Sequence, residues 1–171
     1  MNVKNLKFFP KIIQFLDKEV TFRLYGLEKD DQKLVQSLFT KMNNKQGLEE
    51  LHENYIKYYL DSENNFRLVA DYENELISTI TLMKEEEFKN TKIVHMYAVV
   101  TKKEFQGTGI SGHFFEFACG WAKKIGGTRI KLSTKKDNIR AQKFYEKMGC
   151  LNDGEEEDEI VYIKELSSKI K

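Results

Sequence analysis

The segment of this chain best suited to chemistry is a glycine-rich run, Gln106-Gly107-Thr108-Gly109-Ile110-Ser111-Gly112. Glycine adopts positive φ angles without steric cost and lets the backbone approach a ligand closely. The apolar spacing that follows predicts a helix, and the first N–H groups of a helix have no partner inside it. The run therefore predicts an anion site suited to phosphate. A plain loop with glycines at a tight corner is the alternative.

Three of these glycines, Gly107, Gly109 and Gly112, also match the dinucleotide fingerprint Gly-x-Gly-x-x-Gly. The context argues against that interpretation. Residues 101–106 separate the glycines from the preceding strand, and the next strand ends in Leu-Ser-Thr without the acid that binds a ribose. No Gly-Lys-Ser/Thr follows the run, which excludes a Walker-type phosphate loop.

Charge is unevenly distributed along the chain, although the net charge is only +1. Residues 101–147 carry a net charge of +7, which suits an anionic ligand. Residues 148–171 carry a net charge of −4, with six acids between Asp153 and Glu159. This acidic segment suits a cationic ligand, and a solvated hairpin loop is the alternative.

The predicted elements place the glycine-rich run at the end of a central strand. Residues 93–100 are almost continuously apolar, which is typical of a strand covered on both faces. A helix is predicted from residue 110 to the Gly126-Gly127 pair, and another between Asn138, its N-cap, and Gly149. The remaining pattern predicts strands at residues 20–25, 66–72, 76–83, 129–134 and 160–166, and helices at about 31–42 and 48–59.

The order of these elements predicts an antiparallel hairpin before the central strand and a right-handed parallel crossover after it. A mixed sheet with helices on both faces follows. The length of 171 residues indicates one domain, and residues 1–19 are expected to be an extension to a domain that spans 20–171.

Composition excludes several classes of protein. The apolar fraction of 40% argues against disorder, and no apolar run approaches the ~18 residues of a membrane span. Two cysteines, Cys119 and Cys150, do not make a disulfide framework and are expected to be reduced and buried. The N-terminal residues lack the features of a signal peptide, so we expect a cytoplasmic protein with no membrane or nucleic-acid partner.

A second motif follows the first. Residues 137–150 read Asp-Asn-Ile-Arg-Ala-Gln-Lys-Phe-Tyr-Glu-Lys-Met-Gly-Cys. This resembles the segment Asn-x-x-Ala-x-x-Phe/Leu-Tyr-Glu-Lys-x-Gly-Phe of the GNAT superfamily of N-acetyltransferases. The glycine-rich run resembles the pyrophosphate signature of that superfamily, Arg/Gln-x-x-Gly-x-Gly/Ala, except that Ser111 takes the last place. The separation of the motifs and the strand order are also similar, and the resemblance covers residues 20–166.

The resemblance implies a fold. It is an α+β, three-layer α/β/α arrangement with a mixed, mostly antiparallel central sheet of about six or seven strands. A V-shaped splay separates two parallel strands at the centre of the sheet, and these correspond here to residues 93–100 and 129–134.

The resemblance also implies acetyl-CoA as co-substrate, bound in the splay, with no metal. The backbone of Val99, Val100 and Thr101 would pair with the pantetheine arm, and Asn138 would contact that arm. Phe144 and Tyr145 would line the thioester end. The pyrophosphate would be held by N–H groups of Gln106, Gly107, Thr108, Gly109, Ile110, Ser111 and Gly112.

The reaction implied is direct transfer of the acetyl group to a primary amine. Tyr145 stands where the family places its general acid, although it also lies on an apolar stripe of its helix. N–H groups near Val99 would stabilise the oxyanion. Some members use a glutamate base at the place of Ile93, so no carboxylate base is present there. His95 shares the face of Ile93 and could relay a proton, or it could be a satisfied core residue.

The acceptor is not specified by the sequence. A small molecule, a polyamine or a peptide would each fit, and the acidic segment favours a cationic one. Tyr55, Tyr58 and Tyr59 would line the acceptor site or pack in the core. A catalytically silent CoA-binding module is one alternative, and a dinucleotide-binding oxidoreductase is a less favoured one. The protein is expected to be a monomer or a homodimer.

Overall fold

The computed structural model describes residues 10–15, 17–25, 64–85 and 92–166. The helices expected at residues 31–42 and 48–59, and with them Tyr55, Tyr58 and Tyr59, lie outside the described residues. The helical layer expected on the second face of the sheet falls on the same segment. Among the described residues, no helix is long and apolar enough to cross a membrane.

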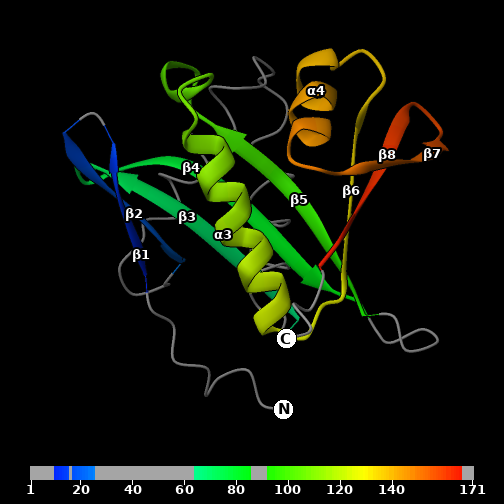
Figure 1. Ribbon diagram of the computed structural model, residues 1–171, viewed down its shortest axis with the longest axis horizontal. Coiled ribbons are helices and arrows are strands. Elements are labelled where there is room, and N and C mark those ends of the chain that lie inside the picture. The colour runs from blue at the N-terminus through cyan, green and yellow to red at the C-terminus, as the bar shows by residue number, and fades with distance from the viewer. Residues whose placement is uncertain (1–9, 16, 26–63, 86–91, 167–171) are drawn as a thin grey trace, which may run out of the picture.

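The architecture is built on one mixed sheet of eight strands in the order β1-β2-β3-β4-β5-β6-β8-β7 (Figure 1). All neighbouring strands are antiparallel except β5 and β6, which are parallel. The sheet and its predicted α+β class are confirmed, with one or two strands more than expected. The strands are β1 (Lys11–Phe15), β2 (Lys18–Leu24), β3 (Asn65–Tyr72), β4 (Glu75–Lys84), β5 (Ile93–Thr101), β6 (Arg129–Lys135), β7 (Leu151–Glu156) and β8 (Glu159–Glu165).

The predicted central strand is central, because β5 has four strands on one side and three on the other. The two added strands are both at edges. β1 pairs with β2, so the sheet begins at Lys11 rather than at Val20, within the stretch expected to be an extension. The boundary between an extension and a domain stays a prediction. β7 is fully exposed and carries acids, so no apolar alternation could reveal it.

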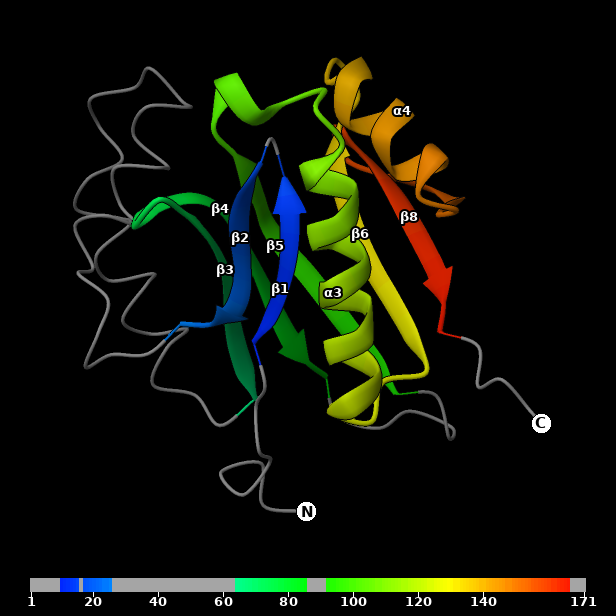
Figure 2. The same ribbon diagram turned by 60° about the vertical axis from the view of Figure 1, so that its left-hand side comes forward.

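One described helix, α3 (Ile110–Lys124), crosses one face of the sheet (Figures 1 and 2). Its apolar residues recur at helical spacing, and that side is buried. Phe114 packs against Phe22 of β2 with ring centroids 5.1 Å apart, and Trp121 stacks on Phe66 of β3. The shorter helix α4 (Ile139–Lys147) lies beside β8 and contacts α3 through aromatic side chains. The two helices carry the two sequence motifs.

The turn after α3 fixes how closely that helix approaches β5. Gly126 ends the helix with a φ of +94°, and the N–H of Gly127 bonds the carbonyl of Ala122 at 2.8 Å. A Cβ on Gly127 would lie 2.6 Å from Cγ2 of Val94 and 2.8 Å from the Ala122 oxygen. The glycine pair therefore does more than stop the helix, because Gly127 allows α3 to pack onto the central strand.

We expect Gly127→Ala to lower the free energy of unfolding by about 1–3 kcal/mol, the usual cost of overpacking a core contact. The measurement is urea unfolding followed by circular dichroism. Gly120→Ala is the matched control in α3, because Gly120 is exposed and no atom lies within 4 Å of its added Cβ. The free energy of unfolding of Gly120→Ala should rise by roughly 0.5–1 kcal/mol, because alanine favours a helix over glycine. Equal stabilities for the two variants would contradict the close approach at Gly127.

Candidate cofactor and acyl-transfer site

The site begins where β5 separates from β6. Only three register pairs join the two strands, Ile93 with Arg129, Val94 with Ile130, and His95 with Lys131. Beyond them the strands diverge, which Figure 1 shows as a V that opens toward α4. The V-shaped splay predicted from the sequence is confirmed. Its physical consequence is that the β5 edge from Met96 to Thr101 has no strand partner on the β6 side among the described residues.

A bulge distorts β5 inside the V. Ala98 has a φ of +50°, a left-handed value that is uncommon for a residue with a side chain. The register with β4 shifts at the same place, because Thr81 pairs with Tyr97 whereas Thr79 pairs with Val100. One residue is therefore extra on β5, which rotates the backbone at Ala98 and Val99. Backbone strain of this kind clusters at functional sites.

The end of β5 is tied to the glycine-rich loop by side-chain hydrogen bonds. The Thr101 hydroxyl lies 2.8 Å from Oγ of Ser78 and accepts from Oγ of Ser111 at 3.1 Å. Nε2 of Gln106 donates to the carbonyl oxygen of Thr101 at 2.7 Å. Ser111 departs from the small apolar residue of the family signature, and its hydroxyl fastens the start of α3 to the strand. These hydrogen bonds therefore join the loop to the end of β5 that lines the V.

The glycine-rich loop has the conformation that its composition predicts. Gly107 and Gly109 have φ angles of +81° and +94°, and Gly109 is the residue before the first turn of α3. Gly112 donates to the Gly109 carbonyl at 3.0 Å, and Thr108 fixes the loop through its hydroxyl on the Phe105 carbonyl. Among the described residues, the N–H groups of residues 107–111 have no backbone acceptor. Such a set of free N–H groups at a helix start fits a pyrophosphate.

Gly112 serves a different purpose from the two left-handed glycines. A Cβ added there would meet Sδ of Met148 at 3.6 Å, an ordinary contact distance. Met148 is the C-cap residue of α4, so the start of α3 packs close to the end of α4. The two motifs that were recognised separately in the sequence are therefore in contact.

Arg140 lies at the candidate site, although the sequence alone did not single it out. Its Nη1 donates to Oε1 of Gln106 across the gap between α4 and the loop, at 2.5 Å. The side chain is exposed, and the guanidinium carries further donors for an anion. A signal was present in the sequence, because Arg140 lies in the block of net charge +7, two residues after Asn138.

Asn138 has the capping role that was predicted for it. Its Oδ1 accepts from the N–H of Ala141 at 3.2 Å and so closes the first turn of α4. The side chain is exposed beside the V. Capping uses only the oxygen, so the amide N–H groups stay available for a ligand, as the family resemblance implies.

Tyr145 lies in a cluster of four rings between α3, α4 and β8. Its ring centroid is 5.6 Å from that of Phe144, 6.3 Å from Phe115 and 5.8 Å from Tyr162. The residue is only 7% exposed, and its hydroxyl makes no hydrogen bond to a described residue. Burial, with a smaller contribution from the Cys150 thiol, raises the pKa of Tyr145 well above its ordinary value of 10.0. The phenol therefore keeps its proton at neutral pH.

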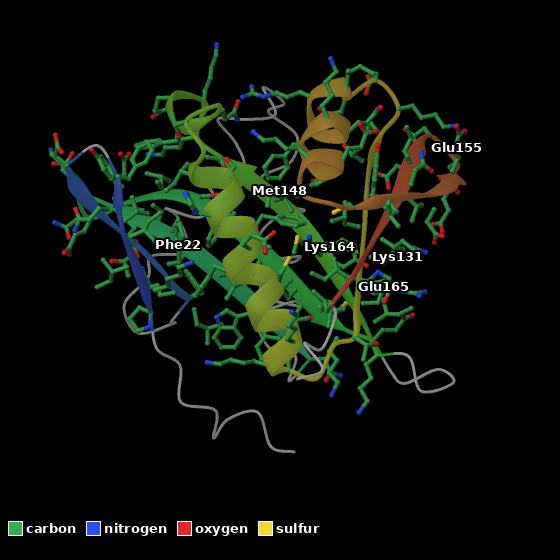
Figure 3. All side chains as sticks on the ribbon, in the orientation of Figure 1. Phe22, Lys131, Met148, Glu155, Lys164 and Glu165 are labelled. Carbon is green, nitrogen blue, oxygen red and sulfur yellow. The ribbon has the colours of Figure 1, made fainter. Side chains whose placement is uncertain are left out.

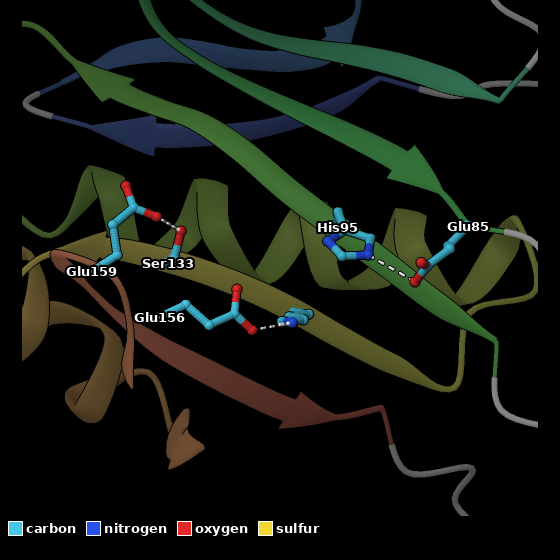
Figure 4. A network of polar contacts seen from close by, with 6 residues as sticks. Glu85, His95, Ser133, Glu156 and Glu159 are labelled. Carbon is cyan, nitrogen blue, oxygen red and sulfur yellow. Dashed lines mark hydrogen bonds and ion pairs between the residues drawn. The ribbon is translucent and has the colours of Figure 1, made fainter. Parts of the chain in front are cut away.

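His95 forms a pair with a carboxylate on the sheet face opposite α3 (Figure 4). Its Nε2 is 2.8 Å from Oε2 of Glu85, and its ring stacks on Tyr97 with 5.6 Å between centroids. The His95 side chain is 17% exposed, and the residue sits at the last register pair before β5 and β6 separate. The sequence suggested His95 but did not reveal Glu85 as its partner, because Glu85 lies outside the strand pattern.

Three of the six acids in the acidic segment have a side-chain partner within the sheet. Glu156 bonds Nζ of Lys131 at 2.8 Å, Glu155 pairs with Lys136, and Glu159 accepts from the Ser133 hydroxyl (Figure 4). The basic block and the acidic block of the sequence therefore partly neutralise each other across β6, β7 and β8. Among the described residues, no group of three or more His, Cys, Asp and Glu side chains could hold a metal ion.

Comparison with known proteins supports the same arrangement. The acetyltransferase (GNAT) family profile matches residues 32–150. No curated protein matches the chain.

Solved structures share the fold at low sequence identity. A structure from Desulfovibrio desulfuricans assigned to the GNAT acetyltransferases is 15% identical, with a TM-score of 0.73 over 86% of this chain and 99% of the other. Glucosamine-6-phosphate N-acetyltransferase from Arabidopsis thaliana is 19% identical, with a TM-score of 0.64 over 81% and 95%. A GNAT family acetyltransferase from Elizabethkingia anophelis, solved with acetyl-CoA bound, is 16% identical, with a TM-score of 0.64 over 85% and 97%.

These structural similarities concern the fold, whereas the profile match spans most of the chain and includes both motifs. The chain belongs to the GNAT family of acetyltransferases.

Proposed function

We propose that this protein transfers the acetyl group of acetyl-CoA to a primary amine by direct attack on the thioester. One observation carries the proposal most strongly. The V between β5 and β6 lies beside a loop whose N–H groups have no backbone acceptor among the described residues, and Tyr145 is buried in the adjacent ring cluster. An elongated anion with a thioester at one end could bind its phosphates at the loop and place its thioester near Tyr145, with the V between them.

The residues present fit acetyl-CoA. The unpaired β5 edge at Val99, Val100 and Thr101 offers backbone groups to an extended amide-containing arm, as a further strand would. The loop from Gln106 to Gly112 offers N–H groups to the pyrophosphate, and Arg140 adds a guanidinium at its rim. Asn138 offers its amide to the arm, and Phe144 offers an apolar surface near the thioester. Acetyl-CoA supplies the activated acetyl group.

The chain itself would supply proton transfer and charge stabilisation. Tyr145 is protonated at neutral pH and can donate its proton to a departing sulfur. The bulge leaves Ala98 and Val99 without register partners on β4, so backbone N–H groups near Val99 would be free to stabilise an oxyanion. The attacking amine must be neutral, which requires a group that removes a proton.

His95 is our proposal for that group. Glu85 contacts Nε2, and a carboxylate there favours the tautomer that leaves the lone pair on Nδ1. Tyr97 holds the ring by stacking, and Tyr97 precedes the bulge directly. His95 is three residues from Ala98 along the strand, so the proton would be transferred through water. Glu85 is the orienting residue in this arrangement.

We expect His95→Gln to lower kcat/KM about 10²-fold, the usual contribution of a positioned base. Glu85→Gln should lower kcat/KM less than His95→Gln does, since His95 stays in place. Glu165→Gln is the control, because it breaks the ion pair with Arg129 on the same sheet but away from the V. Steady-state kinetics provide the test, and an unchanged kcat/KM for His95→Gln would leave His95 a structural residue.

A ligand panel with turnover separates this proposal from its alternatives. Acetyl-CoA and CoA at 100 times their dissociation constants should add about 2.7 kcal/mol of stability and raise Tm, whereas NAD and ATP should not. Stabilisation by NAD alone would favour the oxidoreductase alternative. Thiol release with amine acceptors then distinguishes an enzyme from a silent CoA-binding module, which would bind acetyl-CoA and never release CoA.

The acceptor series in that experiment should include anionic, neutral and cationic amines at low and high salt. We propose a cationic acceptor, attracted mainly by Glu157 and Asp158, which form no ion pair with a described residue. Salt should then raise the KM of cationic amines alone, because screening weakens attraction between exposed charges. A cytoplasmic location, a monomer or homodimer, and the absence of nucleic-acid, membrane and metal partners stay predictions.

A further inference from the structure

Lys164 of β8 connects three elements behind the ring cluster. Its Nζ donates to the carbonyl oxygen of Met148, at 2.5 Å, and lies 3.7 Å from Oε1 of Glu116 on α3. The side chain is only 19% exposed. Figure 3 labels Lys164 and Met148, and their side chains lie close together between α3 and the end of α4. A half-buried lysine with two polar partners is held in one place rather than extended into solvent.

The carbonyl that Lys164 contacts is the C-cap of α4. The last carbonyls of a helix have no partner inside the helix and carry the negative end of its dipole. An ammonium group placed there satisfies one carbonyl and interacts favourably with the dipole. α4 has nine residues, and helices this short depend on tertiary contacts for their stability. Lys164 is such a contact at the end of the helix where Tyr145 lies.

Tyr145 is connected to this contact through the backbone. The carbonyl of Tyr145 accepts from the N–H of Cys150 at 2.9 Å, and Gly149 takes a φ of +75° to make the turn. A Cβ on Gly149 would be 3.4 Å from Nζ of Lys164, so the lysine lies directly on this turn. The turn after α4 is therefore fixed by Lys164 on one side and by the Tyr145 carbonyl on the other.

The same strand also holds the side chain of Tyr145. Tyr162 precedes Lys164 by two residues on β8, so both side chains are on one face of the strand. The Tyr162 ring packs against the Tyr145 ring at 5.8 Å. β8 thus contacts α4 twice, through a ring beside Tyr145 and through an ammonium group at the helix end.

The charge of Lys164 is balanced locally. Glu116 faces it from α3, and Lys164 also lies near the thiols of Cys119 and Cys150. Both thiols are buried, so they are neutral at pH 7 and Glu116 is the one counter-charge among these groups.

We propose that Lys164 is a positioning residue for Tyr145. It holds the C-terminal end of α4 against β8 and α3, and thereby fixes the place of the Tyr145 hydroxyl relative to the V. The proposal rests on the proposed function, in which Tyr145 is the proton donor. Lys164 acts through the backbone of α4 and does not touch substrate.

The test compares Lys164→Met with Lys164→Arg in two backgrounds. Lys164→Met keeps the apolar stem and removes the donor, and we expect kcat to fall about tenfold because small misplacements of a catalytic group are costly. The dissociation constant of acetyl-CoA should change less than about threefold, since the loop and the V are not touched. Lys164→Arg keeps the charge and donors and should restore most of kcat. Glu116→Gln leaves the Lys164–Met148 bond in place and should have a small effect.

The decisive comparison is the double variant. Residues that act as a unit are non-additive, so Lys164→Met should cost almost nothing in a Tyr145→Phe background. An equal fall of kcat in both backgrounds, or a large loss of acetyl-CoA affinity, would overturn the positioning role. Lys164→Gln gives the same comparison should the methionine variant fail to fold. An unchanged kcat in Tyr145→Phe would remove the proton-donor role of Tyr145 and with it the positioning role of Lys164, whereas the proposed function itself fails only if the native protein turns over acetyl-CoA with no amine.

Discussion

Gly109→Val should abolish measurable acetyl-CoA binding, with the dissociation constant raised at least about 100-fold. Gly109 has a φ of +94°, where a β-branched residue is strongly disfavoured. No atom lies within 4 Å of an added Cβ, so the effect comes from backbone strain and from a side chain that enters the space of the ligand. The N–H groups of residues 107–111 would no longer converge. Isothermal titration with acetyl-CoA is the measurement.

Gly120→Ala, within the helix that follows Gly109, is the control, and its affinity for acetyl-CoA should equal that of the native protein. Unfolding curves of both variants show whether the fold persists, because the strain at Gly109 should cost only about 1–3 kcal/mol. Unchanged acetyl-CoA affinity in a folded Gly109→Val variant would show that the loop does not hold the cofactor. A general loss of folding would instead appear in the unfolding curve.

Tyr145→Phe should lower kcat about 10²-fold or more, whereas acetyl-CoA affinity should stay within a few fold. The substitution keeps the ring that packs among Phe115, Phe144 and Tyr162 and removes only the hydroxyl. Steady-state and single-turnover kinetics with an active acceptor measure the effect. Because burial raises the pKa of Tyr145, the native enzyme should lose no activity through deprotonation of this phenol below about pH 10.

Tyr72→Phe is the control for a general effect of losing a phenol, since Tyr72 lies on β3 among other aromatic rings. Its kcat should match the native value. Turnover by Tyr145→Phe at the native rate would mean that water protonates the leaving thiolate. Tyr145 would then be a packing residue, in line with its place on the apolar stripe of α4.

The central part of the fold could be predicted because its elements are specified by patterns within short stretches of sequence. The continuous apolar run of β5, the amphipathic spacing of α3 and the cap at Asn138 each leave a periodic or terminal signal in the sequence. The glycine-rich run also indicated its backbone conformation, since Gly107 and Gly109 both have the positive φ angles that glycine favours. The resemblance to a known family added the splay and the roles of the site residues.

The remaining features depend on contacts between segments far apart in the chain. β7 has no buried face, so only its ladder with β8 identifies it as a strand. The acidic segment suggested free carboxylates, and the pairing of Glu155 and Glu156 with lysines arises only when β6, β7 and β8 are adjacent. The contacts between Arg140 and Gln106 and between Glu85 and His95 likewise join residues far apart in the chain. No periodic pattern in the sequence predicts such pairs.

The two cysteines have a consequence for how the protein reacts with alkylating reagents. Cys119 and Cys150 are free, 4% and 3% exposed, and burial raises their pKa to about 12 and about 11. Reaction requires a thiolate that is accessible, so both should resist iodoacetamide and disulfide reagents while the chain is folded. Labelling would then follow opening of the α3–α4 region, and its rate would report local unfolding. An assay that counts CoA thiols would accordingly carry little background from the enzyme itself.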